Sequence, residues 1–187
     1  MMHSTKFCMI HIPRTGGTVL TNAFGHLPFV SKDVLQNKHL PASRMREIVG
    51  NEIWVNAFKF VIVRDPWDLV YSWYQLLQRS AEGLEDSTGA TDSWLQEVQK
   101  NRATSLEQFV EWDVLSGAFV PQGGFIKKYA NTPDINVLTS VGKAYEMLVM
   151  LTGFDPCLEI RPFSKAPEDS LAKVVREWCH EDVAYLA

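Results

Sequence analysis

The sequence predicts an α/β domain in which a small parallel sheet is flanked by helices. Two apolar runs, Phe7–Ile12 and Phe58–Val63, are short, rich in aromatic and β-branched residues, and each followed at once by a helical pattern. Buried strands that alternate with helices in this way are typical of parallel sheets with helical crossovers. Residues 1–187 are expected to form a single domain, because neither a linker nor a repeat divides them.

A glycine turn follows the first strand. Pro13 cannot donate to a sheet and ends the strand, and Gly16-Gly17 permits a tight turn into a helix expected over Gly17–Gly25. The unpaired amides of a helix's first turn and its dipole attract anions, and Arg14 adds a positive charge beside them. Thr18 supplies a hydroxyl at the same place. The turn therefore predicts a phosphate site, although a turn that uses glycine for geometry alone fits the same residues.

A less regular segment separates the two strands. A short strand is expected at Pro28–Ser31, and a short helix should stop at Gly50, since apolar residues on one helical face precede this glycine. His39 lies just ahead of that helix, in a loop where we expect it to be exposed.

The elements after the second strand are predicted from helical periodicity and capping residues. A helix is expected over Trp67–Arg79, with Ser72 inside it, and the polar residues 80–93 should form a surface loop. Ser105 and Gln108 resemble a capping box that opens a helix through about Val114. The remaining expectations are a loop over Gly117–Gly124, a strand over Ile135–Leu138, a helix over Gly142–Thr152 and one or two closing helices with Pro167 as an early helical residue.

Charge is unevenly distributed along the chain. Residues 1–64 carry eight Lys or Arg against three acids, whereas residues 65–187 carry ten against nineteen. A basic segment in an acidic protein indicates one localised anionic ligand and argues against a nucleic acid held across a wide surface. Chance clustering of solvated charges would give the same counts.

Composition also bounds the location and the metal chemistry. No apolar stretch approaches the roughly 20 residues of a membrane span, and Lys6 runs directly into the first strand, which leaves no room for a signal peptide. We therefore expect a cytoplasmic protein without a membrane span. Cys8, Cys157 and Cys179 are odd in number and far apart, which favours buried thiols over disulfides or a zinc site, and no metal is expected.

Three segments together resemble the PAPS-dependent sulfotransferases, in particular the bacterial, carbohydrate-sulfotransferase-like members. They are Ile12–Thr18, Lys38–Pro41, and Phe60–Asp68 with Ser72 and Tyr74. The resemblance implies a single P-loop-like three-layer domain. It also implies transfer of a sulfuryl group from 3′-phosphoadenosine 5′-phosphosulfate (PAPS) to the hydroxyl of a carbohydrate or other small-molecule acceptor, without a metal.

The resemblance assigns roles to residues by their positions in these motifs. Arg14, Thr15, Gly16, Gly17 and Thr18 would bind the 5′-phosphosulfate, with Arg14 supplying positive charge to the leaving phosphate. Arg64 and Ser72 would bind the 3′-phosphate, although Arg64 could instead pair with Asp65 or Asp68 at the surface. His39 would be the general base that takes the acceptor's proton, a capping or surface histidine being the alternative. His11, inside a strand, is the weaker candidate.

The chain departs from the family at particular positions. Arg14 stands where Lys is usual, which keeps the charge but cannot donate a proton to a leaving oxygen, and Leu69 stands where relatives commonly carry Arg. Gly142–Glu146 has one residue more than the related Gly-Arg-aromatic-Glu pattern. A non-catalytic nucleotide-binding module of the same fold is the alternative. A kinase is disfavoured, because no G-x-x-x-x-G-K-[ST] sequence occurs. The identity of the acceptor and the oligomeric state stay open.

Overall fold

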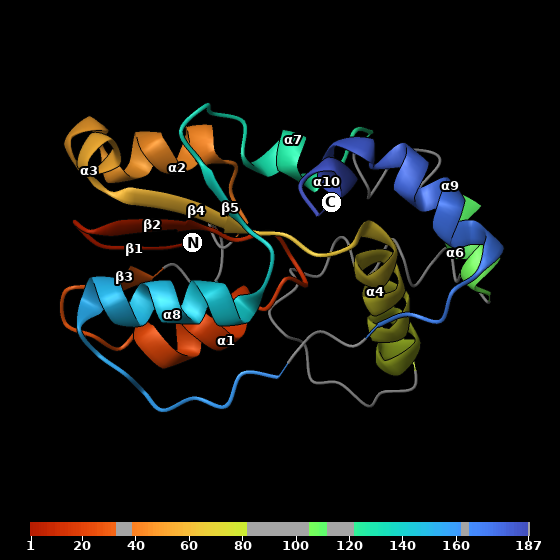
Figure 1. The fold of residues 1–187 in the computed structure, drawn as a ribbon, viewed down its shortest axis with the longest axis horizontal. Coiled ribbons are helices and arrows are strands. Elements are labelled where there is room, and N and C mark those ends of the chain that lie inside the picture. Colours follow the sequence, from red (N-terminus) through yellow and green to blue (C-terminus); the bar gives the residue numbers. More distant parts are fainter. Residues whose placement is uncertain (33–38, 82–104, 112–121, 162–164, 187) are drawn as a thin grey trace.

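The computed structural model describes residues 1–32, 39–81, 105–111, 122–161 and 165–186. Within these ranges the protein is mixed α/β, with a five-stranded open sheet and helices on both of its faces (Figure 1). The strands are β1 (Met2–His3), β2 (Phe7–Ile10), β3 (Ser31–Lys32), β4 (Phe58–Ile62) and β5 (Asn136–Leu138). The helices are α1 (Gly17–Phe24), α2 (Ala42–Val49), α3 (Asn51–Asn56), α4 (Pro66–Ala81), α6 (Leu106–Phe109), α7 (Phe125–Tyr129), α8 (Val141–Thr152), α9 (Ser170–Trp178) and α10 (His180–Ala184).

The sheet has the strand order β3-β1-β2-β4-β5. The two apolar runs pair in parallel, with Met9 opposite Phe60, and β5 continues the parallel part with Asn136 opposite Phe60. The expectation of a wholly parallel sheet is wrong at one edge, because β1 and β3 add antiparallel strands beyond β2. β1 is a two-residue strand that lies close to β2 in the sequence. A short turn therefore joins the two strands in antiparallel pairing, and no crossover helix is needed.

Both faces of the parallel strands are buried. Cys8, Ile10 and Val61 belong to a core cluster shared with α2, α4 and α9, whereas Met9 and Phe60 belong to a second cluster shared with α1 and α8. Figure 1 shows the same division, with α2, α3 and α7 on one side of the sheet and α1 and α8 on the other. Successive side chains of a strand point to opposite faces, so burial on both faces explains why these runs contain almost no polar residue.

Several expected boundaries differ from the structure. The strand expected at Pro28–Ser31 shares only Ser31 with β3. The helix that stops at Gly50 is present as α2, but the chain starts another helix, α3, immediately after this glycine. Gly50 has φ 83°, a backbone conformation that ends one helix and redirects the chain into the next. Cys157 is exposed, while Cys8 and Cys179 are buried thiols as expected.

In the second half of the chain, capping residues determine where helices begin. Ser105 Oγ accepts the amide of Gln108 at 3.2 Å and opens α6, and residues 112–114 of the helix expected there lie outside the described residues. The same is true of 82–93 and 117–121 in the two expected loops. Pro167 is not helical: α9 begins at Ser170, because Asp169 caps it by accepting the amide of Leu171 at 3.1 Å.

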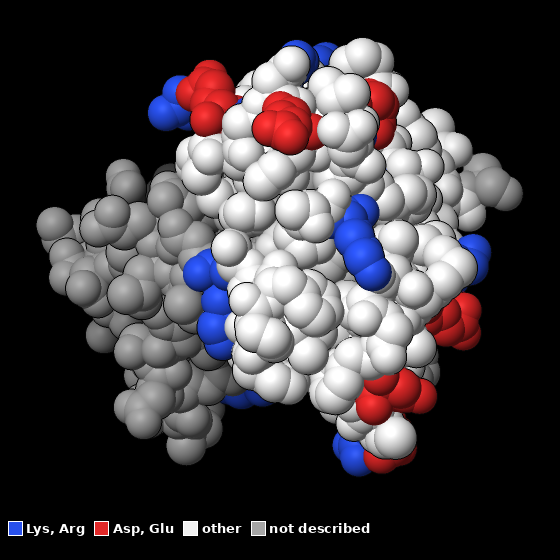
Figure 2. Space-filling model, turned by 90° about the vertical axis from the view of Figure 1, so that its left-hand side faces the viewer, with Lys and Arg blue, Asp and Glu red and all other residues white. Residues whose placement is uncertain are grey.

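Charged side chains do not gather on the face at the amino ends of the strands. Figure 2 shows this face, where Lys, Arg, Asp and Glu are scattered among uncharged residues. Among the described residues, no helix is both long enough and apolar enough to cross a membrane.

The C-terminal helix is fastened to α7 by a buried carboxylate. Asp182 Oδ2 accepts the amide of Phe125 at 2.7 Å and Oδ1 accepts that of Ile126 at 2.8 Å. Burial raises the pKa of Asp182 to about 6 despite these two hydrogen bonds. Gly124 lies against the carboxylate with φ 114°, and a Cβ there would lie 2.5 Å from Asp182 Cγ.

We predict that Gly124→Ala lowers the free energy of unfolding by at least about 2 kcal/mol, through backbone strain and the clash with Asp182. Gly153→Ala is the matched control, because Gly153 has φ 69° and open space around the new Cβ. We expect it to cost about 1 kcal/mol. Urea unfolding of both variants measures the difference, and equal losses would show that Asp182 is not held against residue 124.

Candidate functional site

Two turns meet at the carboxyl ends of β2 and β4. Ile10, the last residue of β2, pairs in parallel with Val61, so the turn after β2 and the turn after β4 leave the same edge of the sheet. In open α/β sheets, ligands bind at this edge, where strands end and helices begin. The residues expected to form the site are carried by these turns and by the helices that follow them.

The turn after β2 has an unusual backbone. Arg14 has φ 65° and Gly16 has φ 80°, so two residues of the turn take the left-handed conformation. Thr15 is buried, and its hydroxyl donates to the carbonyl of Ile12 at 2.8 Å, which closes the turn. Gly16 caps α1 and has no side chain to accept from the first-turn amides, and Thr18 is exposed in that turn. These amides are the donors that an anion would use.

A side-chain hydrogen bond joins this turn to α4. Arg14 Nε donates to Ser72 Oγ at 3.0 Å, across 58 residues of sequence. The side chain of Arg64, at the end of the second strand segment, also reaches the turn, where its Nη1 lies 3.4 Å from the carbonyl oxygen of Arg14. The structure therefore brings together Arg14, Arg64 and Ser72, three of the residues expected to bind phosphate.

Charges of both signs surround Arg64. Burial lowers the pKa of Arg64; the carboxylates of Asp68 and Asp65 oppose this shift and the neighbouring positive charge of Arg14 adds to it. A guanidinium group in such a place can interact with a phosphate group. Ser72 is buried at 7% exposure and adds a neutral hydroxyl.

His39 lies against His11, the residue that follows β2. Its Nδ1 is 3.0 Å from the carbonyl oxygen of His11, and the two ring centroids are 4.5 Å apart. The ring of His11 is buried against Gly17, where a Cβ would lie 2.3 Å from His11 Cδ2. Gly17 is thus required at the first position of α1 because no larger residue fits beside this histidine. His39 itself is exposed, as its loop position predicted.

Leu69 lies in the hydrophobic core. It is 2% exposed and packs in the cluster that covers one face of the sheet. Position 69, where the family that the chain resembles commonly carries an arginine, therefore contributes packing in this chain and no positive charge.

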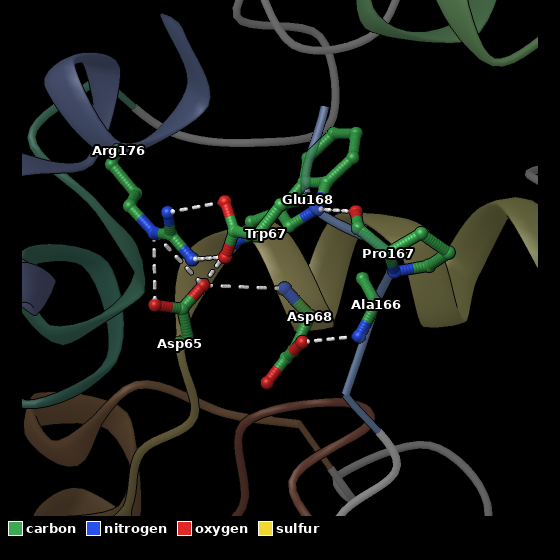
Figure 3. A network of polar contacts seen from close by, with 7 residues as sticks. All are labelled: Asp65, Trp67, Asp68, Ala166, Pro167, Glu168 and Arg176. Carbon is green, nitrogen blue, oxygen red and sulfur yellow. Dashed lines mark hydrogen bonds and ion pairs between the residues drawn. The ribbon is translucent and has the colours of Figure 1, made fainter. Parts of the chain in front are cut away.

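The sequence analysis missed the network that holds the start of α4 (Figure 3). Asp65 Oδ1 accepts the amide of Trp67 at 2.9 Å and caps the helix, while Asp65 Oδ2 pairs with Arg176 Nε at 3.0 Å. Arg176 also pairs with Glu168 at 3.0 Å, and these two carboxylates raise its pKa. Asp65, an alternative partner expected for Arg64, thus pairs with Arg176. The capping role of Asp65 could have been predicted from its position before Pro66. Its ion pair with Arg176 could not, because Arg176 lies 111 residues away.

Two further contacts tie the same helix start to the segment before α9. Trp67 Nε1 donates to the carbonyl of Pro167 at 2.8 Å, and Asp68 Oδ1 accepts the amide of Ala166 at 2.6 Å. With the Asp65–Arg176 pair, they fix the helix that carries Ser72 relative to α9 (Figure 3). This network thus positions Ser72 through contacts with a segment that is distant in sequence.

Comparisons of the chain with protein-family models, curated proteins and solved structures find no match. Among the described residues, no group of three or more His, Cys, Asp and Glu side chains is arranged to hold a metal ion. A surface hollow of about 430 Å³ over α9 and α10 contains none of the expected site residues. The candidate site therefore consists of Arg14, Arg64 and Ser72, which contact one another, and of His39, which contacts His11.

We predict that Gly17→Ala destabilises the protein by about 1–3 kcal/mol, because the new methyl group must displace the ring of His11. Gly142→Ala is the matched control in the first turn of α8, where the nearest atom to the new Cβ is Ser140 Oγ at 3.8 Å. It should leave stability unchanged or raise it by up to about 1 kcal/mol, since alanine favours helix. Thermal unfolding of the two variants tests this, and a Gly17→Ala protein as stable as wild type would contradict the packing of His11.

Proposed function

We propose that this protein is a PAPS-dependent sulfotransferase with a P-loop-like three-layer fold, which transfers a sulfuryl group to an acceptor hydroxyl, such as that of a carbohydrate. The observation that carries the proposal is the Arg14 Nε–Ser72 Oγ contact of 3.0 Å. It joins the two motifs that resemble the 5′-phosphosulfate and 3′-phosphate sites of the family. A nucleotide with phosphates at both positions needs the two motifs in one site.

The nucleotide would lie across the edge of the sheet. The amides of Gly16, Gly17 and Thr18 at the start of α1, with the Thr18 hydroxyl, suit the 5′-phosphosulfate. Arg64 offers a bidentate fork and Ser72 a neutral hydroxyl to the 3′-phosphate. Thr15 would act through the shape of the turn, because its hydroxyl already donates to the carbonyl of Ile12.

The proposed reaction is an in-line displacement at sulfur. The acceptor oxygen forms a bond to sulfur as the bond from sulfur to the 5′-phosphate oxygen breaks, and the products are a sulfate ester and 3′-phosphoadenosine 5′-phosphate (PAP). Catalysis of this kind depends on positioning and on positive charge at the leaving phosphate. Arg14 would supply that charge. The leaving group would depart as an anion, since an arginine does not give up its proton.

His39 would take the proton of the acceptor hydroxyl. A carbonyl oxygen only accepts hydrogen bonds, so the 3.0 Å contact with His11 O requires the proton on His39 Nδ1. The lone pair of the neutral ring is then on Nε2, which makes Nε2 the atom that accepts the proton. A positioned general base contributes about 10² to 10⁴ to the rate. No metal takes part in the proposed step.

A non-catalytic nucleotide-binding module is the second candidate. It is favoured by Leu69, whose burial in the core removes the charge that relatives commonly place at this position. Nucleotide binding with no transfer would distinguish this candidate from the enzyme.

We predict that PAP raises the melting temperature and that AMP, which lacks the 3′-phosphate, does so much less. PAP at about 100 times its dissociation constant adds roughly 2.7 kcal/mol. For a chain of this size that is a rise of roughly 5–10 °C. Arg64→Ala and Ser72→Ala should weaken PAP binding and leave AMP binding nearly unchanged. Lys173→Ala is the control, because it removes one positive charge from a side chain that is 83% exposed on α9. Equal shifts with PAP and AMP would remove the 3′-phosphate role of Arg64 and Ser72.

We also predict that His39→Ala lowers the rate of sulfuryl transfer from PAPS by about 10² to 10⁴ while PAP binding is retained. The assay is transfer of labelled sulfate to a panel of monosaccharides and small phenols. His180→Ala is the control, since His180 is exposed on α10. Transfer that is equally fast in wild type and His39→Ala would exclude His39 as the base, and PAP binding without any transfer by wild type would favour the module.

A further inference from the structure

His39 is supported by another histidine. The ring of His11 is 3% exposed, its centroid lies 4.5 Å from that of His39, and the two ring planes make an angle of 51°. The carbonyl of the same residue lies 3.0 Å from His39 Nδ1. His11 thus contacts His39 through both its main chain and its side chain.

The main-chain contact sets the tautomer of His39. Because the carbonyl can only accept, it keeps the proton on Nδ1 and the lone pair on Nε2. When Nε2 gains a proton, the ring becomes positively charged and its Nδ1–H becomes a stronger donor to the same carbonyl. The carbonyl therefore holds the neutral and the charged form of His39 in one orientation. Hydrogen-bonded partners commonly orient functional histidines in this way.

The side-chain contact sets the direction of the His39 ring. His39 is an exposed turn residue, and side chains of this kind need support from rigid elements to hold one geometry. His11 follows directly after β2, and its ring is fixed against Gly17, where even a methyl group would come within 2.3 Å. The buried His11 ring is thus a rigid surface against which the His39 ring packs.

We infer that His11 is a positioning residue that sets the tautomer and orientation of His39. The expected effect of His11 on turnover rests on the proposed sulfotransferase function. The expected tautomer of His39 does not rest on it, because the tautomer is a property of the protein without substrate.

The first test is NMR of the ¹⁵N-labelled full chain at a pH where imidazoles are neutral. Long-range ¹H–¹⁵N spectra, assigned with His39→Ala, report which ring nitrogen carries the proton. We expect the Nδ1–H form of His39 in wild type. His11→Ala keeps the main-chain carbonyl but removes the ring that holds His39 against it, so the His39 ring should turn away from the carbonyl and populate both tautomers. His11→Asn, which keeps a planar side chain, should lie between them and serves if the alanine variant does not fold. An Nε2–H form in wild type, or the same tautomer in all folded variants, would overturn the inference.

The second test is steady-state sulfuryl transfer by His11→Ala, His39→Ala and the double variant. Loss of the His11 ring in His11→Ala should lower kcat by about 10- to 100-fold and leave the dissociation constant of PAP within about twofold of wild type. Because His11 acts through His39, the double variant should be no slower than His39→Ala alone. A further loss in the double variant, or a weaker PAP complex with unchanged kcat, would assign His11 a merely structural role. If wild type transfers nothing, the proposed function fails, and the NMR result still decides the positioning of His39.

Discussion

The parallel pairing of β2 with β4 is the constraint on which the candidate site depends. Its register places Ile10 beside Val61, so the turn that holds Arg14 and the turn that holds Arg64 leave the sheet side by side. A slip by one residue would exchange the two faces of a strand. Since Cys8 and Met9 are both buried, in different core clusters, such a slip would place every side chain of β2 in the wrong cluster. Core packing thereby fixes the distance between two turns that are far apart in sequence.

The predictions from sequence succeeded where the signal was local. Apolar β-branched runs, a proline stop and a glycine pair are read within a dozen residues, and they located β2, α1, β4 and α4. The antiparallel strands β1 and β3 were missed or misplaced because each has only two residues, too few for any periodicity. Pro167 was wrongly expected in a helix: Asp169 caps α9 after it, and its carbonyl accepts a hydrogen bond from Trp67, which is 100 residues away. Contacts over such separations are invisible in a single sequence.

The candidate site divides in the same way. The residues of the site were predicted from motifs, but the contacts between them were not. The Arg14–Ser72 hydrogen bond and the packing of His39 against His11 both follow from the tertiary arrangement. Arg176 and Pro167 lie outside every motif, yet their contacts with Asp65 and Trp67 anchor the helix that presents Ser72. The motifs therefore identified the candidate residues, whereas several of the partners that hold these residues in place come from the rest of the fold.

Departures from local rules gather at the turn after β2. A non-glycine residue with positive φ costs roughly 1–2 kcal/mol, and Arg14 has this conformation while its charge lies near that of Arg64. Strain alone does not indicate a site, because Cys157 also has positive φ, at 52°, in a turn where its backbone amide donates a hydrogen bond to Asp155 Oδ1 at 2.8 Å. At Arg14 the strained backbone coincides with a second positive charge, with the amides of α1 and with a buried histidine. The carboxylates of Asp68 and Asp65 oppose the effect of Arg14 on Arg64, so the turn lies among charges of both signs. The coincidence of positive φ with two neighbouring guanidinium groups, more than positive φ alone, sets the turn after β2 apart from the turn at Cys157.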